Sequence, residues 1–126
     1  MTEIEVREDC SGVARKARLR DFNLAFIRGE IEETLRYVAE DVRWRLVGEG
    51  TIEGRDGMRA WLESMAGKSA RRVVLESVVL DGDIAAVNGT YEMESGSTFE
   101  FCDLYEFAGP EPDSPIADYT SYVIRT

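Results

Sequence analysis

The chain has 126 residues, of which 44% are hydrophobic and 10% aromatic, and its formal net charge is −10. This length and apolar content suit one globular domain with its own core. The acidic balance argues against nucleic acid and anionic membranes as partners. With no histidine, and with Cys10 and Cys102 as the two cysteines, the sequence excludes Ser-His-Asp and Cys-His nucleophiles. It offers no metal-ligand cluster, and we predict no cofactor.

The first eight residues lack the basic start and apolar core of a signal peptide. No apolar run approaches the length that a membrane-spanning helix needs. We therefore expect a cytoplasmic protein with reduced thiols. Weak alternation around Ile4 and Val6 indicates a tail or a short strand over residues 1–8, followed by a single domain over residues 9–126.

Two helices are predicted in the first third of the chain. The first begins at a cap supplied by Asp9 or Ser11 and ends near residue 28, before Gly29. The second covers residues 31–40. Both have apolar residues at helical spacing, which are Leu19, Phe22 and Phe26 in the first and Ile31, Leu35 and Val38 in the second.

A strand and a third helix follow. Residues 42–47 alternate and place Val42, Trp44 and Leu46 on one face of a strand. The glycines at 48, 50 and 54 mark turns or a bent ribbon. Asp56 is the expected cap of the third helix, whose apolar stripe consists of Met58, Trp61, Leu62 and Met65.

After Ala70 the hydrophobic period changes from helical to two. This change predicts four strands, over residues 72–80, 84–93, 98–107 and 116–124. The Asp81-Gly82-Asp83 connection is a strong hairpin signal. Together the elements predict an α+β cone, in which three N-terminal helices pack in a strongly curved, mostly antiparallel sheet.

One carboxylate stands in an aromatic row on the strand 98–107. Alternation places Asp103 on the same face as Phe99, Phe101, Tyr105 and Phe107. If this face is interior, burial disfavours the charged carboxylate and raises its pKa. A raised pKa suits proton transfer or hydrogen-bond donation near neutral pH. The equally weighted alternative is a structural Asp that is tied to a nearby Tyr, Thr or Arg.

The chain resembles the nuclear-transport-factor-2-like superfamily, specifically its SnoaL-like and ketosteroid-isomerase-related branch. The resemblance covers roughly residue 11 to the end and rests on the order of the elements. Four local patterns support it, namely Gly29-Glu30-Ile31-Glu32, Ala39-Glu40-Asp41-Val42-Arg43-Trp44, Ile52-Glu53-Gly54-Arg55-Asp56-Gly57-Met58, and Phe101-Cys102-Asp103-Leu104-Tyr105-Glu106-Phe107 with residues 116–124 as the last hairpin. This fold hosts isomerases, cyclases, hydrolases and proteins without catalytic activity.

The resemblance also implies roles at matching positions. Asp103 matches the protonated Asp with which the isomerases donate a hydrogen bond to the enolate oxygen. Phe22 matches their oxyanion tyrosine and Leu46 matches their general base. Neither side chain can perform that role, so the resemblance does not extend to steroid isomerisation.

Two functions remain open. The first is a small-molecule pocket protein, either an isomerase-, cyclase- or hydrolase-like enzyme or a binder, in which Asp103 is an acid/base or a hydrogen-bond donor to an apolar ligand that bears a carbonyl or hydroxyl group. Tyr105 is the second catalytic candidate, and the expected pocket lining consists of Phe22, Trp44, Leu46, Met58, Trp61, Phe101 and Tyr122. The second is a non-catalytic homodimeric binding or scaffold domain with a plugged pocket. We expect a homodimer through the outward sheet face, which Glu100, Cys102, Leu104 and Glu106 sample.

Overall fold

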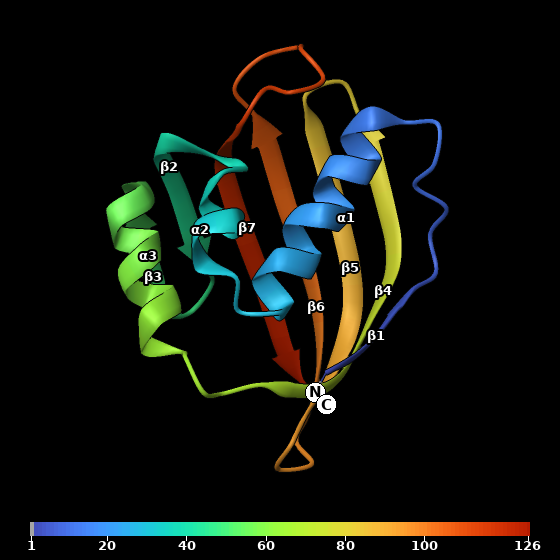
Figure 1. Ribbon diagram of the computed structural model, residues 1–126, viewed down its shortest axis with the longest axis vertical. Helices are drawn as coiled ribbons and strands as arrows, with labels where there is room; N and C mark the ends of the chain where they lie inside the picture. Colours follow the sequence, from blue (N-terminus) through green and yellow to red (C-terminus); the bar gives the residue numbers. More distant parts are fainter. Residues whose placement is uncertain (1) are drawn as a thin grey trace.

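The computed structural model describes residues 2–126, within which it contains three helices and seven strands. The strands form one sheet in the order β1-β4-β5-β6-β7-β2-β3 (Figure 1). Its pairs are antiparallel except for β1 with β4 and β2 with β7. The bounds are Glu3–Val6 for β1, Val38–Leu46 for β2, Gly50–Glu53 for β3, Ala70–Asp81 for β4, Ile84–Met93 for β5, Thr98–Phe107 for β6 and Ile116–Arg125 for β7.

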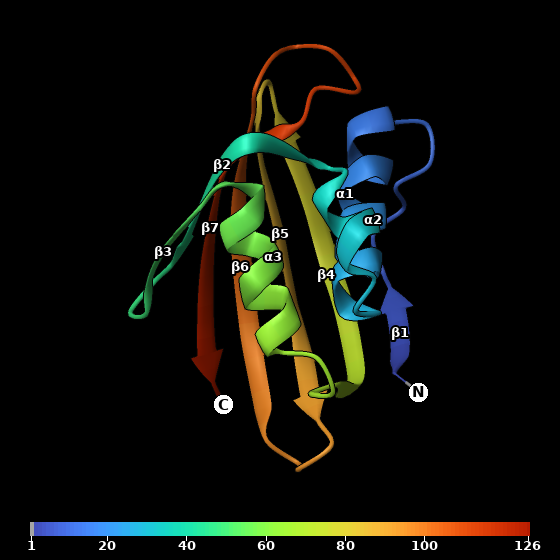
Figure 2. The same ribbon diagram turned by 60° about the vertical axis from the view of Figure 1, so that its left-hand side comes forward.

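The three helices are α1 (Ala14–Ile27), α2 (Ile31–Leu35) and α3 (Gly54–Ser64). The sheet is strongly curved and the helices lie on its concave side, as Figure 2 shows. Within residues 2–126 no helix is long and apolar enough to cross a membrane. The predicted architecture, an α+β cone of three helices in a curved and mostly antiparallel sheet, is confirmed.

The predicted cap of α1 is wrong. The helix begins at Ala14, and its N-cap residue Val13 makes no side-chain capping bond. The Asp9 carboxylate instead accepts hydrogen bonds from the backbone N and the Oγ of Ser11, at 3.0 and 2.6 Å. The two candidate caps therefore satisfy each other in a local turn, which competes with helix initiation.

The second helix is shorter than predicted. It ends at Leu35, and Val38 begins β2 instead of completing the apolar face of a helix. The backbone N of Ile116 donates to the Tyr37 carbonyl oxygen at 2.9 Å, and Val38 pairs with Ile116 in the sheet. Sheet pairing of a fully buried, β-branched residue therefore overrides the helical spacing.

The glycine-rich segment after β2 forms an antiparallel strand, β3, which pairs with β2. This is the bent ribbon that the glycines indicated. The helix α3 then begins at Gly54, so Asp56 lies in its first turn and is not the cap. Its carboxylate accepts a hydrogen bond from Arg59 at 3.0 Å, in a position that the helix dipole also favours.

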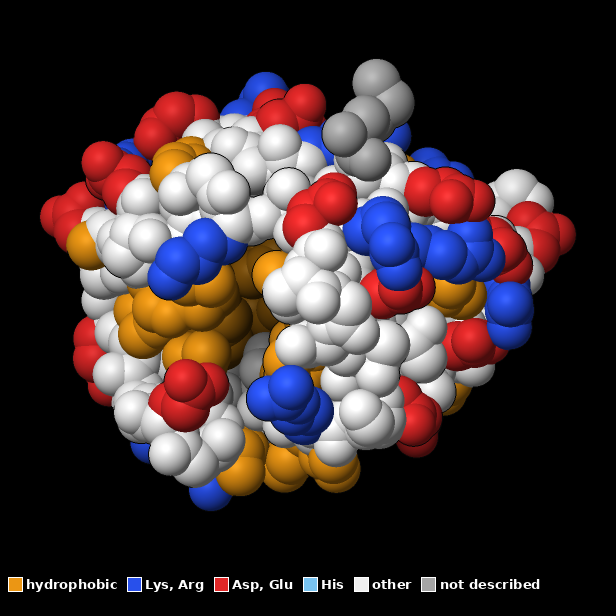
Figure 3. Space-filling view, turned by 90° about the horizontal axis from the view of Figure 1, so that it is seen from below, with side chains coloured by type: hydrophobic (Ala, Val, Ile, Leu, Met, Phe, Trp, Pro, Cys, Tyr) orange, Lys and Arg blue, Asp and Glu red, His pale blue; other side chains and the backbone are white. Residues whose placement is uncertain are grey.

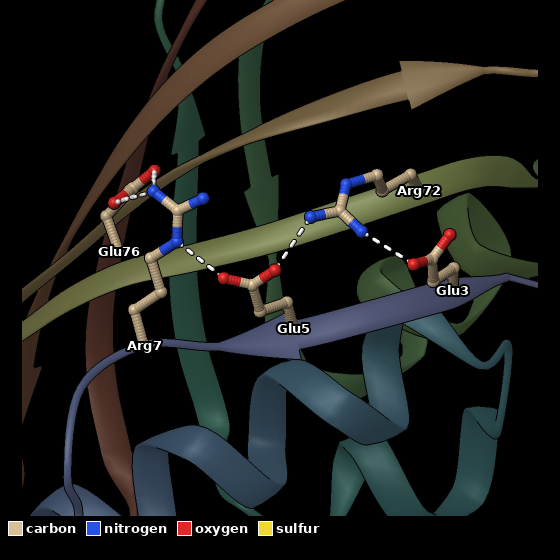
Figure 4. A network of polar contacts seen from close by, with 5 residues as sticks. All are labelled: Glu3, Glu5, Arg7, Arg72 and Glu76. Atoms are coloured by element: carbon tan, nitrogen blue, oxygen red, sulfur yellow. Dashed lines mark hydrogen bonds and ion pairs between the residues drawn. The ribbon is translucent and has the colours of Figure 1, made fainter.

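Residues 3–6 form a strand at the edge of the sheet, parallel to β4. Acidic and basic side chains alternate along this edge, as Figure 4 shows. The Arg72 guanidinium contacts Glu3 and Glu5, each at 2.7 Å. The Arg7 guanidinium contacts Glu5 at 2.6 Å and Glu76 at 3.0 Å. This ladder of five charged residues attaches β1 to the sheet and gives the edge a charged surface.

Candidate functional site

Asp103 lies in the middle of β6 and is 5% exposed. The sheet register places Val87 of β5 and Ser121 of β7 directly opposite it. Residues that face each other in this way point to the same side of a sheet. The Asp103 carboxyl is therefore inward and buried, as the alternation along the strand predicts.

Two tyrosine hydroxyls meet the Asp103 carboxyl. The hydroxyls of Tyr105 and Tyr119 each lie 3.4 Å from the same oxygen, Oδ2. The rings of the two tyrosines stack with centroids 4.9 Å apart, because Tyr105 and Tyr119 stand opposite each other in register. Ser121 stands directly opposite Asp103 in register, and its hydroxyl lowers the pKa of the carboxyl. The group is thus enclosed by three hydroxyls.

Burial raises the pKa of Asp103 to about 7, although the Ser121, Tyr119 and Tyr105 hydroxyls lower it. Burial also raises the pKa of Tyr105 and of Tyr119 well above the ordinary tyrosine value. Both tyrosines therefore remain neutral hydrogen-bond donors at neutral pH. Asp103 is the titrating member of the cluster, and both of its protonation states are accessible near pH 7.

Two N–H donors extend the cluster. The Asn23 amide nitrogen Nδ2 donates to the Leu19 carbonyl oxygen at 2.9 Å and to the Tyr105 hydroxyl at 3.2 Å. The Trp44 indole Nε1 donates to Ser121 Oγ at 2.9 Å. The polar groups thus form one connected network across α1, β2, β6 and β7.

Sequence reasoning missed Asn23, Tyr119 and Ser121. A signal for Asn23 is present, because this amide follows Phe22 directly on the buried side of α1. Tyr119 and Ser121 follow from the β6–β7 register, which a sequence pattern does not specify. Sequence reasoning found Asp103 and Tyr105, which the structure brings together.

Six of the seven predicted pocket residues divide into two groups. Phe22, Trp44 and Met58 are at most 2% exposed, so they fill the narrow part of the cone. The Phe22 ring meets Tyr105 and Tyr119 edge-on, at 6.0 and 5.7 Å between centroids. Large aromatic side chains dominate core burial in this way. This part of the predicted pocket is packed core.

The other end of the concave face is open. Figure 3, which views this end of the molecule, shows a hollow with an apolar lining. The register places four side chains toward this end of the inner face, and all are partly or well exposed, namely Tyr91, Phe99, Phe101 and Val123. Leu46 of β2 and Trp61 of α3, both predicted pocket residues, are also half-buried. Leu46 stands opposite Ser121 in register.

Asp103 and its partner Ser121 form the next inward-facing residue pair after Phe101 and Val123, counted from this open end. Phe101 precedes Asp103 by two residues on the same face, and Tyr91 lies near enough for the Asp103 charge to raise its pKa, after burial as the larger cause. Gly89 makes room for the Phe101 ring, since a Cβ at this position would overlap the Val74 carbonyl oxygen and come within 3.0 Å of that ring. The partly exposed aromatic side chains of the open end therefore follow next to the buried carboxyl along β5 and β6.

The placement of Tyr122 in the predicted pocket is wrong. This residue stands opposite Cys102 on the outer face of the sheet and is 40% exposed. A bulge in β7 is the reason, because the register shifts between the pairs Glu106–Asp118 and Phe107–Ile116. Alternation from the buried Ile116 would turn Tyr122 inward, and the extra residue in the bulge reverses the faces.

Similarity to known proteins agrees with this architecture. The SnoaL-like domain model matches residues 19–111. An NTF2-like protein of unknown function from Burkholderia pseudomallei superposes with a TM-score of 0.74, at 19% identity, over 88% of this chain and 91% of that chain. Among curated proteins none matches the chain by sequence.

Two further solved structures have names that refer to enzymes. A protein from Kribbella flavida, provisionally named ketosteroid isomerase, has a TM-score of 0.74 at 17% identity, over 90% of this chain and 79% of that one. An epoxide hydrolase of the LEH-like type from M. tuberculosis has a TM-score of 0.73 at 17% identity, over 88% and 83%. At such identities these likenesses establish the fold alone. Because the family model covers most of the chain, the protein belongs to the SnoaL-like domain family.

Proposed function

We propose that the protein binds a small apolar molecule at the open end of the cone, and that Asp103 acts on a carbonyl or hydroxyl group of that molecule as an acid, a base or a hydrogen-bond partner. The observation that carries this proposal is a buried carboxyl with a pKa of about 7, two residues along β6 from the partly exposed Phe101 of the open end. Such convergence of apolar lining and one perturbed polar group is typical of ligand sites.

The geometry also supports a particular polar contact. Both tyrosine hydroxyls lie on Oδ2 of Asp103, so Oδ1 is the oxygen that the tyrosines leave for a ligand. Tyr91, Phe99 and Phe101 supply flat apolar surfaces, and the Tyr91 and Phe99 rings stack at 4.9 Å. An aromatic or polycyclic body with one carbonyl or hydroxyl group matches this set of side chains.

Binding of two matched probes tests the proposal. 2-Naphthol and naphthalene share one ring system and differ by a hydroxyl. We expect NMR titration to detect binding of both at residues of the hollow, with 2-naphthol bound about 2–10-fold more tightly, the factor that corresponds to one net hydrogen bond. In Asp103→Leu this preference should disappear while naphthalene still binds.

The matched control is Asp118→Asn, which changes a carboxylate on the outer face of β7. This variant should retain the preference for 2-naphthol. Absence of binding by either probe at millimolar concentration contradicts a pocket at this end of the cone. Equal affinity for the two probes contradicts a role for Asp103 in ligand recognition.

We further propose that two copies of the chain associate through the outer face of the sheet. Five large apolar residues on this face are 40–67% exposed, namely Val79, Ile84, Leu104, Tyr122 and Ile124. They lie on four adjacent strands, β4 to β7, which gives a broad surface. Exposed apolar surface of this kind marks an interaction site, and closed two-fold dimers are the commonest arrangement. This association is compatible with a catalytic and with a non-catalytic domain.

A further inference from the structure

The hydrogen bonds around Asp103 have a direction that the two outermost donors determine. The Trp44 indole N–H can only donate, so Ser121 Oγ accepts from it at 2.9 Å. The Asn23 Nδ2 donates to the Leu19 carbonyl oxygen, which identifies it as the amide nitrogen, and also donates to the Tyr105 hydroxyl at 3.2 Å. Each hydroxyl that accepts one of these bonds has its own proton free to donate further inward.

The inner acceptor in this arrangement is the Asp103 carboxyl. The Tyr105 and Tyr119 hydroxyls both lie 3.4 Å from Oδ2, and Ser121 stands directly opposite Asp103 in register. The Tyr119 hydroxyl donates to the carboxyl, and burial raises the pKa of this tyrosine, so it keeps its proton. The hydrogen bonds of the cluster therefore share one direction, with the donors on the side of Asn23 and Trp44 and the final acceptor at Asp103.

We propose that Asn23 and Trp44 are positioning residues, which orient the Tyr105 and Ser121 hydroxyls as donors toward Asp103 and so hold its carboxyl as a hydrogen-bond acceptor, the form that a general base requires. The proposal builds on the proposed function, since it selects the base among the roles considered for Asp103. It differs from the role that the family resemblance implies, in which the Asp is protonated and donates.

The remaining groups around the carboxyl do not oppose this orientation. The titratable groups that face Asp103 are Tyr105 on its own strand, Tyr119 of β7 and Tyr91 of β5, and burial raises the pKa of all three. The side chains that α1 and β2 contribute, Asn23 and Trp44, are uncharged. Burial and three hydroxyls account for the shift of the Asp103 pKa, and none of them is a charge.

The test is a carbon-13 NMR titration of the Asp103 carboxyl in the ligand-free protein and in two variants, Asn23→Leu and Trp44→Phe. Each variant removes one N–H donor, while leucine keeps the approximate size of asparagine and phenylalanine keeps an aromatic ring at position 44. If the donors position the hydroxyls, the freed hydroxyls no longer favour the carboxylate, and the pKa of Asp103 should rise by about 0.5–1 unit, a three- to tenfold tighter binding of the proton.

The sign of the change separates positioning from packing. If these residues only fill space, their replacement loosens the core, admits water and moves the pKa of Asp103 down toward its ordinary value. Phe22→Leu is the matched control, since Phe22 packs on both tyrosines but has no N–H in the network. It should leave the pKa unchanged or lower it.

A rise in either donor variant, with no rise in the control, supports the proposal. An unchanged or lowered pKa in the donor variants overturns it, as does an equal rise in Phe22→Leu. The two variants act from different elements, so Trp44→Phe decides the question if Asn23→Leu does not fold. The titration uses no ligand, so a negative result here does not contradict the proposed pocket. Equally, a failure of 2-naphthol to bind does not contradict a positive titration result.

Discussion

Tyr105 and Tyr119 stack at 4.9 Å between ring centroids, and both hydroxyls lie 3.4 Å from Oδ2 of one carboxyl. The stack holds two polar groups of adjacent strands on the same atom, without any charged partner. Burial outweighs these bonds and raises the pKa of that carboxyl, Asp103, to about 7. A carboxyl whose pKa lies near neutral pH thus arises within a core that is largely aromatic.

The first prediction concerns stability and pH. The folded state binds the Asp103 proton with a pKa of about 7, whereas the ordinary value is 3.8. Between these values the folded chain binds more protons than the unfolded chain, so the contribution of Asp103 to the unfolding free energy is greatest below about pH 4 and falls as the pH rises through 7. The slope approaches ~1.4 kcal/mol per pH unit.

Asp103→Asn removes this titration and should therefore remove the slope. Urea denaturation of both proteins at pH 5, 6, 7 and 8 gives the difference between their unfolding free energies at each pH. The other carboxylates are the same in both proteins, so their contributions cancel in this difference. Relative to the wild type, the variant should gain stability from pH 5 to 8. A difference that stays constant across this range would mean that Asp103 titrates near its ordinary pKa.

The second prediction concerns the hydroxyl of Tyr119, which lowers the pKa of Asp103. Tyr119→Phe keeps the ring and its stack on Tyr105 but deletes the donor. The pKa of Asp103 should rise, by about 0.5–1 unit for one lost hydrogen bond. NMR titration measures the rise, and Tyr122→Phe, on the outer face, should leave the pKa where it is.

The third prediction concerns Gly89. A Cβ there would overlap the Val74 carbonyl oxygen and touch the Phe101 ring, so Gly89→Ala should destabilise the fold by ~1–3 kcal/mol. Gly57→Ala is the control, because this position lies within α3 and its Cβ meets only the Cγ2 methyl group of Ile52, at 3.2 Å. Alanine favours helix, so this variant should lie within ~1 kcal/mol of the wild type. Equal stability of both variants in urea would contradict the close approach at Gly89.

The fourth prediction concerns the edge strand β1. Arg72 joins Glu3 and Glu5 in the charged ladder, and because these carboxylates are exposed to solvent, each pair adds little to the global stability. Arg72→Gln should accelerate hydrogen exchange of the β1 amides while the amides of β5 and β6 keep their protection. Arg43→Gln makes the same change of charge on β2 and should not affect β1. Unaltered exchange in β1 would show that backbone pairing alone holds it.

The fifth prediction concerns the proposed dimer. Sedimentation of the wild-type chain at micromolar concentration should give twice the mass of the 14.2 kDa chain. Leu104→Lys adds a charge at the centre of the outer apolar face and should yield the monomer. Val13→Lys, an equally exposed apolar site before α1, should not change the mass. A wild-type monomer would contradict association through this face.

The fold class and the inward position of Asp103 can both be predicted from the sequence. The change of period near Ala70 separates helices from strands, and strict alternation along β6 places Asp103 and Tyr105 on one face. Both signals are local, because each side chain's direction within a strand or helix depends on a few neighbours. The aromatic row around Asp103 is sufficient to predict that this face is interior.

The groups that surround this carboxyl depend on how distant segments pair in the folded chain. The bulge between Phe107 and Glu106 in the β6–β7 pairing turns Tyr119 and Ser121 inward and Tyr122 outward. Pairing with β7 likewise takes Val38 from the expected helix into β2. Register, bulges and helix ends depend on the free energy of contacts between distant segments, and a one-residue shift in register exchanges the two faces of a strand. Local spacing contains no information about that choice.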